Sequence, residues 1–101
     1  MSNSSLDPTA ERTPLLLDVR SSAEFASGHI DGALHLPLDQ IQQDAPRLLP
    51  DPSQPLIVYC ASGARSAFAC AVLNQMGYRR AMNGGGMSLL AMGLERPLRT
   101  A

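Results

Sequence analysis

The segment from Leu56 to Met76 constrains the fold more than any other part of the chain. It begins with LIVYC, a short run of β-branched, aliphatic and aromatic residues that is typical of a buried strand and ends at Cys60. The small residues ASGA follow. From Arg65 onward the apolar residues recur three or four positions apart, which predicts a helix with one buried face that stops at Gly77. The residues of that face are Ala69, Val72, Leu73 and Met76.

A second unit of strand and helix lies nearer the beginning of the chain. PLLLDVR (Pro14 to Arg20) is a continuous apolar run stopped by charge, which fits a strand buried on both faces. SSAE follows it and matches a capping box, in which the Ser21 side chain accepts from a helix amide and the Glu24 side chain reaches back to the Ser21 amide. We therefore expect a short helix that ends at Gly28.

The remaining segments continue the alternation. GALHLPL (Gly32 to Leu38) reads as a short strand, and Asp39 is positioned to cap a helix that Pro46 should kink or divide. RAMNGGG (Arg80 to Gly86) predicts a brief strand and a glycine turn, and MSLLAM a last helix before Gly93. Strands and helices in this order predict an α/β sandwich with a mainly parallel sheet.

Length and composition narrow the class of protein. A chain of 101 residues has room for one domain. With 8 basic residues, 9 acidic residues and a net charge of -1 it has no electrostatic footprint for nucleic acid. No apolar run is long enough to span a membrane, and the first residues resemble no secretory signal. Two cysteines do not form a disulfide framework. We expect a cytoplasmic protein with reduced thiols and neither nucleic-acid nor membrane partners.

Cys60 stands at the carboxyl edge of the predicted sheet, where open α/β folds bind ligands. The small loop residues allow backbone amides to converge there, and the following helix adds its positive end. Such surroundings favour a thiolate, and the Arg65 guanidinium suits sulfonate, phosphate or carboxylate oxygens. The pattern predicts a nucleophile that acts on an anionic substrate. The alternative is a buried strand-end thiol that only packs.

The other cysteine and the methionines have simpler interpretations. Cys70 falls inside the predicted helix, where a packing role is expected. A resolving role, closing a disulfide with Cys60, would need backbone movement. Met82, Met87 and Met92 are expected in the core rather than at an interface.

Several motifs together resemble the single-domain rhodanese family of sulfurtransferases. They are DVR at Asp18 to Arg20, EF at Glu24, GHI at Gly28, GA at Gly32, and the C-x-x-G-x-R-S loop from Cys60 to Ser66. The resemblance covers about residues 14 to 94 and implies a rhodanese-like three-layer sandwich, with a mainly parallel five-stranded sheet flanked by helices. It suggests a flexible N-terminal arm at 1–13, the rhodanese domain at 14–95 and a C-terminal tail at 96–101.

The resemblance also implies a mechanism in which Cys60 is the catalytic residue and carries a persulfide. Thiosulfate or another sulfane-sulfur donor would load it, and cyanide, thioredoxin, glutathione or a sulfur-relay protein would accept the sulfur. No cofactor and no metal are expected. The loop would bind the substrate through residues that are small or carry a donor: Ala61, Ser62, Gly63, Ala64, Arg65 and Ser66.

Two alternatives remain within this resemblance. One is a persulfide carrier or sensor that acts through a protein partner and turns over slowly on small molecules. The other is a phosphatase-like enzyme, but related phosphatases resemble C-x5-R, whereas Cys60 and Arg65 here enclose only 4 residues. The shorter loop disfavours a phosphate-sized site. The chain also resembles compact phage-shock-type rhodaneses, which usually carry a secretory signal, so a processed form and a cytoplasmic branch both stay open.

The other matched residues are expected to support the site. Asp18 and Arg20 resemble a bracing pair next to the loop. Glu24 should pair with Arg20 or cap its helix. His29 is expected to orient backbone at a turn rather than to act in catalysis. Ser62 and Ser66 can donate to the cysteine sulfur or cap the following helix, and for Ser66 we expect the cap.

Overall fold

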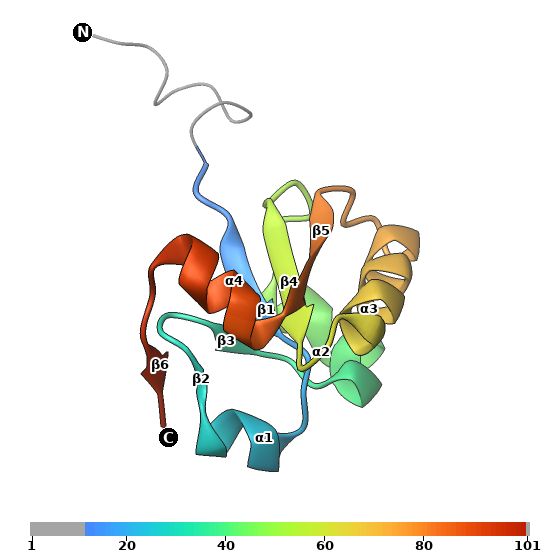
Figure 1. The fold of residues 1–101 in the computed structure, drawn as a ribbon. Coiled ribbons are helices and arrows are strands. Elements are labelled where there is room, and N and C mark those ends of the chain that lie inside the picture. Colours follow the sequence, from blue (N-terminus) through green and yellow to red (C-terminus); the bar gives the residue numbers. More distant parts are fainter. Residues whose placement is uncertain (1–11, 101) are drawn as a thin grey trace, which may run out of the picture.

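The structure, a computed structural model, describes residues 12–100, and its centre is a parallel sheet (Figure 1). The sheet has 4 strands in the order β3-β1-β4-β5. Neighbouring strands in this order are parallel, and β4 lies between β1 and β5. The strands are β1 (Leu15–Asp18), β3 (Leu34–His35), β4 (Leu56–Cys60) and β5 (Ala81–Gly86).

Helices cover both faces of this sheet and complete three layers (Figure 1). Successive strand residues point to opposite faces. Val58 therefore packs with residues of α2 and α3 on one face, while Tyr59 packs with α4 on the other. The helices are α1 (Ser22–Ser27), the 3-10 turn η2 (Leu38–Gln40), α2 (Ile41–Leu48), α3 (Ala64–Gln75) and α4 (Met87–Leu94).

The α/β class and its layers are confirmed, but the main sheet of the described residues has 4 strands where five were expected. Two short segments pair with each other instead, as an antiparallel ribbon of β2 (His29–Ile30) and β6 (Leu98–Arg99). An ion pair of 3.1 Å between Arg99 and Asp31 lies beside this ribbon. Strands of two residues are too short to show a period in the sequence, so this pairing was not anticipated.

The capping box that opens α1 is confirmed. The Ser21 hydroxyl accepts from the Glu24 amide (3.2 Å), and the Glu24 carboxylate accepts from the Ser21 amide (3.0 Å). Gly28 caps the other end of α1, as expected. The predicted end of α3 is also confirmed, because Gly77 follows the cap residue Met76 with a φ of 105°.

One prediction for the next helix was wrong. Asp39 caps no helix, because the 3-10 turn starts at Leu38 and includes Asp39. The cap residue of α2 is Gln40, whose side chain makes no capping hydrogen bond. Pro46 lies within α2 and does not divide it, and the alternative, a kink, stays a prediction. Proline has no N–H, so the Gln42 carbonyl lacks the helical donor that another residue at position 46 would supply. Gln42 is exposed, so water can replace that hydrogen bond.

The predicted glycine turn is part of a strand, because β5 continues through Gly86 with a register shift opposite Val58 and Tyr59. Close packing explains the glycines. A Cβ on Gly84 would lie 2.7 Å from the Ile57 side chain, and one on Gly86 would lie 2.8 Å from the Ala61 carbonyl oxygen. The glycine run therefore lets β5 lie directly against β4 and against the loop that follows Cys60.

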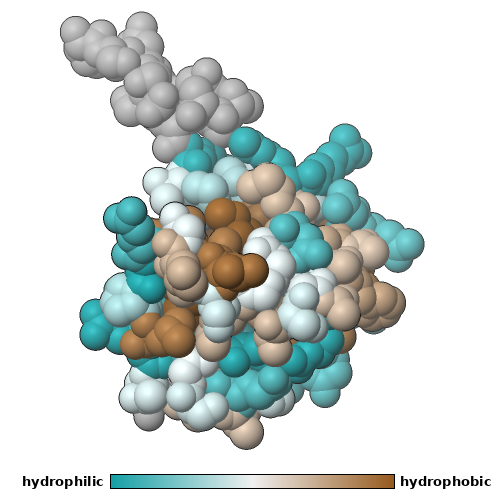
Figure 2. Space-filling model, viewed as in Figure 1, coloured by the Kyte–Doolittle hydropathy of each residue, from teal (hydrophilic) through white to brown (hydrophobic). Residues whose placement is uncertain are grey.

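The last helix also differs from its prediction. α4 passes through Gly93 and ends at Leu94. Met87 packs against the core, but the core placement of the other two methionines was wrong, since Met82 is 52% and Met92 72% exposed. Figure 2 shows apolar surface over α4, the helix that carries Met92 and the exposed Leu89.

The predicted N-terminal arm lies mostly outside the described residues. Of its last part, Arg12 forms a 2.7 Å ion pair with Asp51 in the loop before β4. Within residues 12–100, no helix has the length and apolar character that crossing a membrane requires.

Candidate active site

Cys60 is the last residue of β4, at the carboxyl edge of the sheet, and its side chain is fully buried. The chain turns through Ala61 and Ser62, both exposed, and α3 begins directly after its cap residue Gly63. Gly63 adopts a φ of 103°, in the left-handed region that favours glycine. The predicted order of strand, tight loop and helix is confirmed, and it aims the start of α3 at the thiol.

Donors of the loop surround the sulfur of Cys60. The Gly63 amide donates to Sγ at 2.9 Å and the Ser66 amide at 3.4 Å, while the Ser66 hydroxyl oxygen lies 3.5 Å from Sγ. Burial disfavours the thiolate, but the Ser66 hydroxyl and the amides of Ser66, Gly63 and Ser62 outweigh it and lower the pKa of Cys60 to about 7. The site can therefore supply a thiolate near neutral pH.

Ser66 has a different role from the expected cap. It lies in the first turn of α3 and is fully buried, and its hydroxyl donates to the Asn83 side-chain oxygen at 2.6 Å. With the thiol protonated, Sγ donates to the Ser66 oxygen. In the thiolate, the same hydroxyl can turn its hydrogen toward the sulfur.

Asn83 is a site residue that sequence reasoning missed. Its side-chain oxygen also accepts from the Gly85 amide (2.9 Å), and its nitrogen donates to the Gly63 carbonyl (3.2 Å). The only sequence signal was its place before three glycines, which indicated a turn rather than a brace for the loop.

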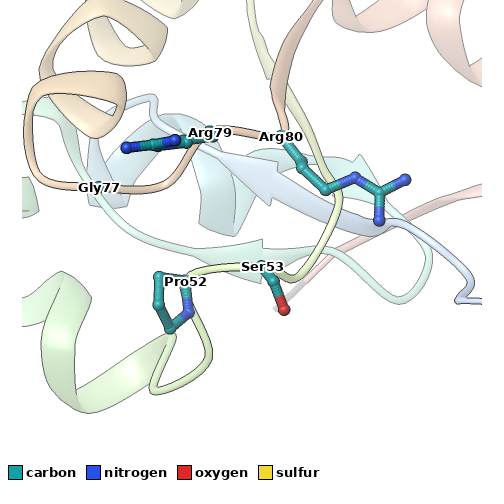
Figure 3. A pocket seen from close by; sticks show the side chains of 5 residues that line it. All are labelled: Pro52, Ser53, Gly77, Arg79 and Arg80. Carbon is teal, nitrogen blue, oxygen red and sulfur yellow. The ribbon is translucent and has the colours of Figure 1, made fainter. Parts of the chain in front are cut away.

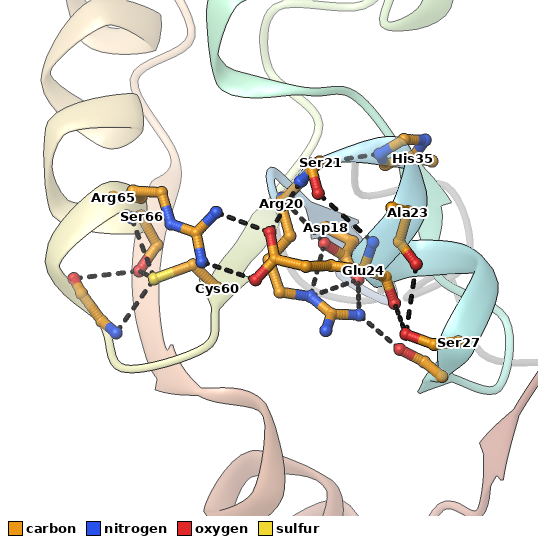
Figure 4. Close-up of polar contacts among 12 residues, drawn as sticks. Asp18, Arg20, Ser21, Ala23, Glu24, Ser27, His35, Cys60, Arg65 and Ser66 are labelled. Atoms are coloured by element: carbon orange, nitrogen blue, oxygen red, sulfur yellow. Dashed lines mark hydrogen bonds and ion pairs between the residues drawn. The ribbon is translucent and has the colours of Figure 1, made fainter.

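Arg65 lies in the first turn of α3, and its guanidinium forms a two-point ion pair with the carboxylate of Glu24 (Figure 4). Nη1 donates to Oε1 at 2.7 Å and Nη2 to Oε2 at 2.9 Å. Of the two roles expected for Glu24, the cap of α1 is confirmed, and its ion pair is with Arg65 rather than with Arg20. The hydrogen bonds from Arg65, and then those from Ser21, lower the pKa of Glu24 to about 2.

Asp18 and Arg20 form a buried ion pair beside the site (Figure 4). Asp18 is 0% and Arg20 5% exposed, and Nη2 of Arg20 donates to Oδ2 of Asp18 at 2.8 Å. Arg20 also donates to the Gly28 carbonyl, while His35 Nε2 donates to the Arg20 carbonyl at 2.8 Å. The pair thus holds the turn after β1 in place, as a bracing pair would.

His29 contacts backbone, as expected, since its Nδ1 donates to the Phe25 carbonyl at 2.8 Å. Cys70 is a free, partly buried cysteine that packs against the core, and burial raises the pKa of its thiol. The remaining loop residue, Ala64, is exposed at the start of α3.

A cavity of about 370 Å³, which Arg79 and Arg80 help to line, lies elsewhere in the described residues (Figure 3). It lies at the amino edge of the sheet, because its other lining residues precede β4 and β5: Pro52, Ser53 and Gly77. The cavity is therefore separate from the Cys60 loop. In residues 12–100, no cluster of His, Cys, Asp or Glu side chains is suited to a metal ion.

Comparisons with known proteins agree with this geometry. The model of the rhodanese-like domain family matches residues 4–92. The chain is 33% identical over 76 residues to the thiosulfate sulfurtransferase PspE of Escherichia coli K12, a match that covers 75% of this chain and 73% of PspE. It is 45% identical over 69 residues to a sulfurtransferase of Allochromatium vinosum, covering 68% of this chain but less than two thirds (63%) of that relative.

A solved structure shows the same fold. The structure of a rhodanese with anions from E. coli superposes with a TM-score of 0.77 at 27% identity. The match covers 88% of this chain and 100% of that one.

Proposed function

This chain belongs to the rhodanese-like domain family of sulfurtransferases, and we propose that it moves a sulfane sulfur from thiosulfate, or a related donor, to cyanide or a thiol through a persulfide on Cys60. Cys60 is the nucleophile in this proposal. The loop from Ala61 to Ser66 binds the donor, and the Asp18–Arg20 pair supports the loop's surroundings.

In the first half-reaction the Cys60 thiolate attacks the outer sulfur of thiosulfate. A sulfur–sulfur bond to Cys60 forms, the sulfur–sulfur bond of thiosulfate breaks, and sulfite leaves with the electron pair. Cys60 becomes an anionic persulfide. The amides of Gly63 and Ser66, which point at Sγ, suit a negative charge before and after this step.

In the second half-reaction the acceptor attacks the terminal sulfur of the persulfide. Cyanide forms thiocyanate, and a thiol acceptor such as glutathione, thioredoxin or a sulfur-relay protein takes the sulfur as its own persulfide. Cys60 leaves as the thiolate and the cycle closes. Two successive displacements of this kind give ping-pong kinetics.

The observation that carries the proposal is the set of donors on a buried strand-end thiol with a pKa of about 7. The test mixes the protein with thiosulfate and cyanide and measures thiocyanate. Cys60→Ser should remove the activity, whereas Cys70→Ser should retain it, because Cys70 lies one helix turn beyond the loop. An equal rate from wild type and Cys60→Ser would contradict the proposal, as would hydrolysis of an aryl phosphate without sulfur transfer.

A second candidate is a persulfide carrier that depends on a protein acceptor. The similarity to the putative sulfur carrier protein YrkF of Bacillus subtilis favours it, at 31% identity over 68 residues, although the match covers only 36% of that relative. Intact mass spectrometry after thiosulfate treatment separates the two functions. A stable gain of one sulfur that cyanide removes slowly indicates a carrier, and rapid loss of that sulfur to cyanide indicates an enzyme.

A further inference from the structure

The Glu24–Arg65 ion pair places a fixed negative charge beside the Cys60 loop. The guanidinium lies between the Cys60 side chain and the Glu24 carboxylate in Figure 4. The pKa of Arg65 is raised mainly by its hydrogen bonds to Glu24 and also by the charge of Cys60, so the guanidinium interacts with both. The charge that would attract an anionic donor is therefore balanced by a carboxylate from another element, α1.

The pair also uses part of the donor set of Arg65. One hydrogen of each terminal nitrogen points to Glu24, so the Nε–H and the second hydrogen of each terminal nitrogen remain for another ligand. An anion can approach along that edge without displacing Glu24. The anion then meets a guanidinium whose positive charge is already paired with the Glu24 carboxylate.

The neighbouring carboxylate of Asp18 does not act on a ligand at the loop in the way that Glu24 does. The carboxylate of Asp18 is fully buried and is neutralised by Arg20. Glu24 is different, because its side chain is 36% exposed and its partner Arg65 is 39% exposed. A ligand at the loop therefore meets the Glu24 charge through Arg65, in a position that solvent reaches.

We propose that Glu24 determines donor specificity by charge: it disfavours dianionic thiosulfate and favours sulfur donors with one negative charge or none, such as thiosulfonates and alkyl persulfides. This inference rests on the proposed sulfurtransferase function. With a thiosulfonate, the Cys60 thiolate attacks the outer sulfur and a sulfinate leaves with the electron pair. The charge on the enzyme changes in the same way as with thiosulfate, so only the charge of the donor differs.

A conservative variant separates the charge of Glu24 from its structural role. Gln at position 24 keeps an oxygen that can accept from the Ser21 amide, since capping boxes use Glu or Gln at this position. Glu24→Gln removes the charge and one of the two oxygens that accept from Arg65, while it keeps an acceptor for the cap. Asp31→Asn is the matched control, because Asp31 pairs with Arg99 at the ribbon of β2 and β6, away from the loop.

The experiment compares kcat/KM for thiosulfate and for benzenethiosulfonate, with cyanide as acceptor, in wild type, Glu24→Gln and Asp31→Asn. Glu24→Gln should raise the value for thiosulfate by about three- to fivefold, the range expected for half-exposed charges, and raise the thiosulfonate value less. Asp31→Asn should leave the ratio of the two donors unchanged. An unchanged ratio in Glu24→Gln, with thermal unfolding like that of wild type, overturns the inference.

A second measurement does not depend on turnover. Sulfate should protect Cys60 from iodoacetamide at a concentration about three- to fivefold lower in Glu24→Gln than in wild type. Equal protection in both proteins overturns the inference even if transfer is fast. If instead wild type transfers sulfur from neither donor while sulfate protection shifts as expected, the proposed function fails and the charge effect of Glu24 stands.

Discussion

The Ser66 hydroxyl donates to the Asn83 side-chain oxygen across 2.6 Å and thereby joins the first turn of α3 to strand β5. The same hydroxyl oxygen is 3.5 Å from Sγ of Cys60. The Gly63 carbonyl oxygen, at 3.1 Å, is a further acceptor for this hydroxyl. Ser66 is thus shared among the nucleophile, the loop and a neighbouring strand, and ionisation of the thiol adds the sulfur to the acceptors that compete for its one hydrogen. This sharing makes Ser66 a suitable residue for testing the electrostatics of the site.

Ser66→Ala should raise the pKa of Cys60 above about 7, because the hydroxyl is the largest of the groups that lower it. The Ser66 amide stays in place, so the rise should be partial, on the order of one unit. The measurement is the pH dependence of iodoacetamide alkylation. Ser27→Ala removes a hydroxyl that bonds only to carbonyls within α1 and should leave the pKa unchanged. Equal curves for wild type and Ser66→Ala would contradict this account.

In the wild-type protein, alkylation of Cys60 should persist into mildly acidic solution. With a pKa of about 7, half of the thiol is ionised near pH 7 and the rate falls as the pH drops below that value. At pH 6 the thiolate fraction should exceed that of an ordinary cysteine by about thirtyfold. Cys70 provides an internal reference, since burial raises its pKa. A Cys60 profile centred above pH 8 would show that the loop amides do not stabilise the thiolate.

Gly86→Ala should damage the loop after Cys60, whereas Gly93→Ala should not. A Cβ at position 86 would lie 2.8 Å from the Ala61 carbonyl oxygen, but nothing lies within 4 Å of one at position 93. We expect Gly86→Ala to lose transfer activity and about 1–3 kcal/mol of stability, and Gly93→Ala, within α4, to gain about 0.5–1 kcal/mol. Urea unfolding and thiocyanate formation measure both. Equal behaviour of the two variants would contradict the close packing of β5 on the loop.

Asp18→Asn should destabilise the fold strongly, because it leaves the buried Arg20 guanidinium without its counter-charge. The expected loss in the free energy of unfolding is about 3 kcal/mol. Asp44→Asn is the comparison, since Asp44 pairs with an Arg47 side chain that is 70% exposed, and such pairs contribute less than about 1 kcal/mol. Urea unfolding of the two variants gives the difference, and similar midpoints would exclude a bracing role for the Asp18–Arg20 pair.

Local signals in the sequence predicted local structure well. The Ser21–Glu24 capping box, the apolar run from Leu56 to Cys60 and the end of α3 at Gly77 are each written within a few neighbouring residues. The hydrogen bonds and backbone preferences that determine these features involve residues only a few positions apart. A sequence pattern therefore contains nearly all the information about these features.

Contacts between distant segments were not predictable in the same way. Glu24 and Arg65 are 41 positions apart, and Ser66 and Asn83 are 17 apart. Which acidic residue meets Arg65 depends on where α1 lies relative to α3, and no periodicity encodes that placement. Glu24 was therefore expected to pair with Arg20, its neighbour in sequence, or to cap its helix, and its contact with Arg65 was not anticipated. Asn83 was not recognised as part of the site.

The attachment of α1 has a consequence for how the site can be observed. This helix of 6 residues buries none of its own side chains, so it contributes little to the core and relies on a few edge contacts. One is the stacking of Phe25 on His29, and another is the Glu24–Arg65 pair itself. Local opening is easiest in such weakly anchored segments. Any ligand that draws Arg65 away from Glu24 should therefore accelerate hydrogen exchange at the amides of α1, and that first helix would report on the occupancy of a loop far along the chain.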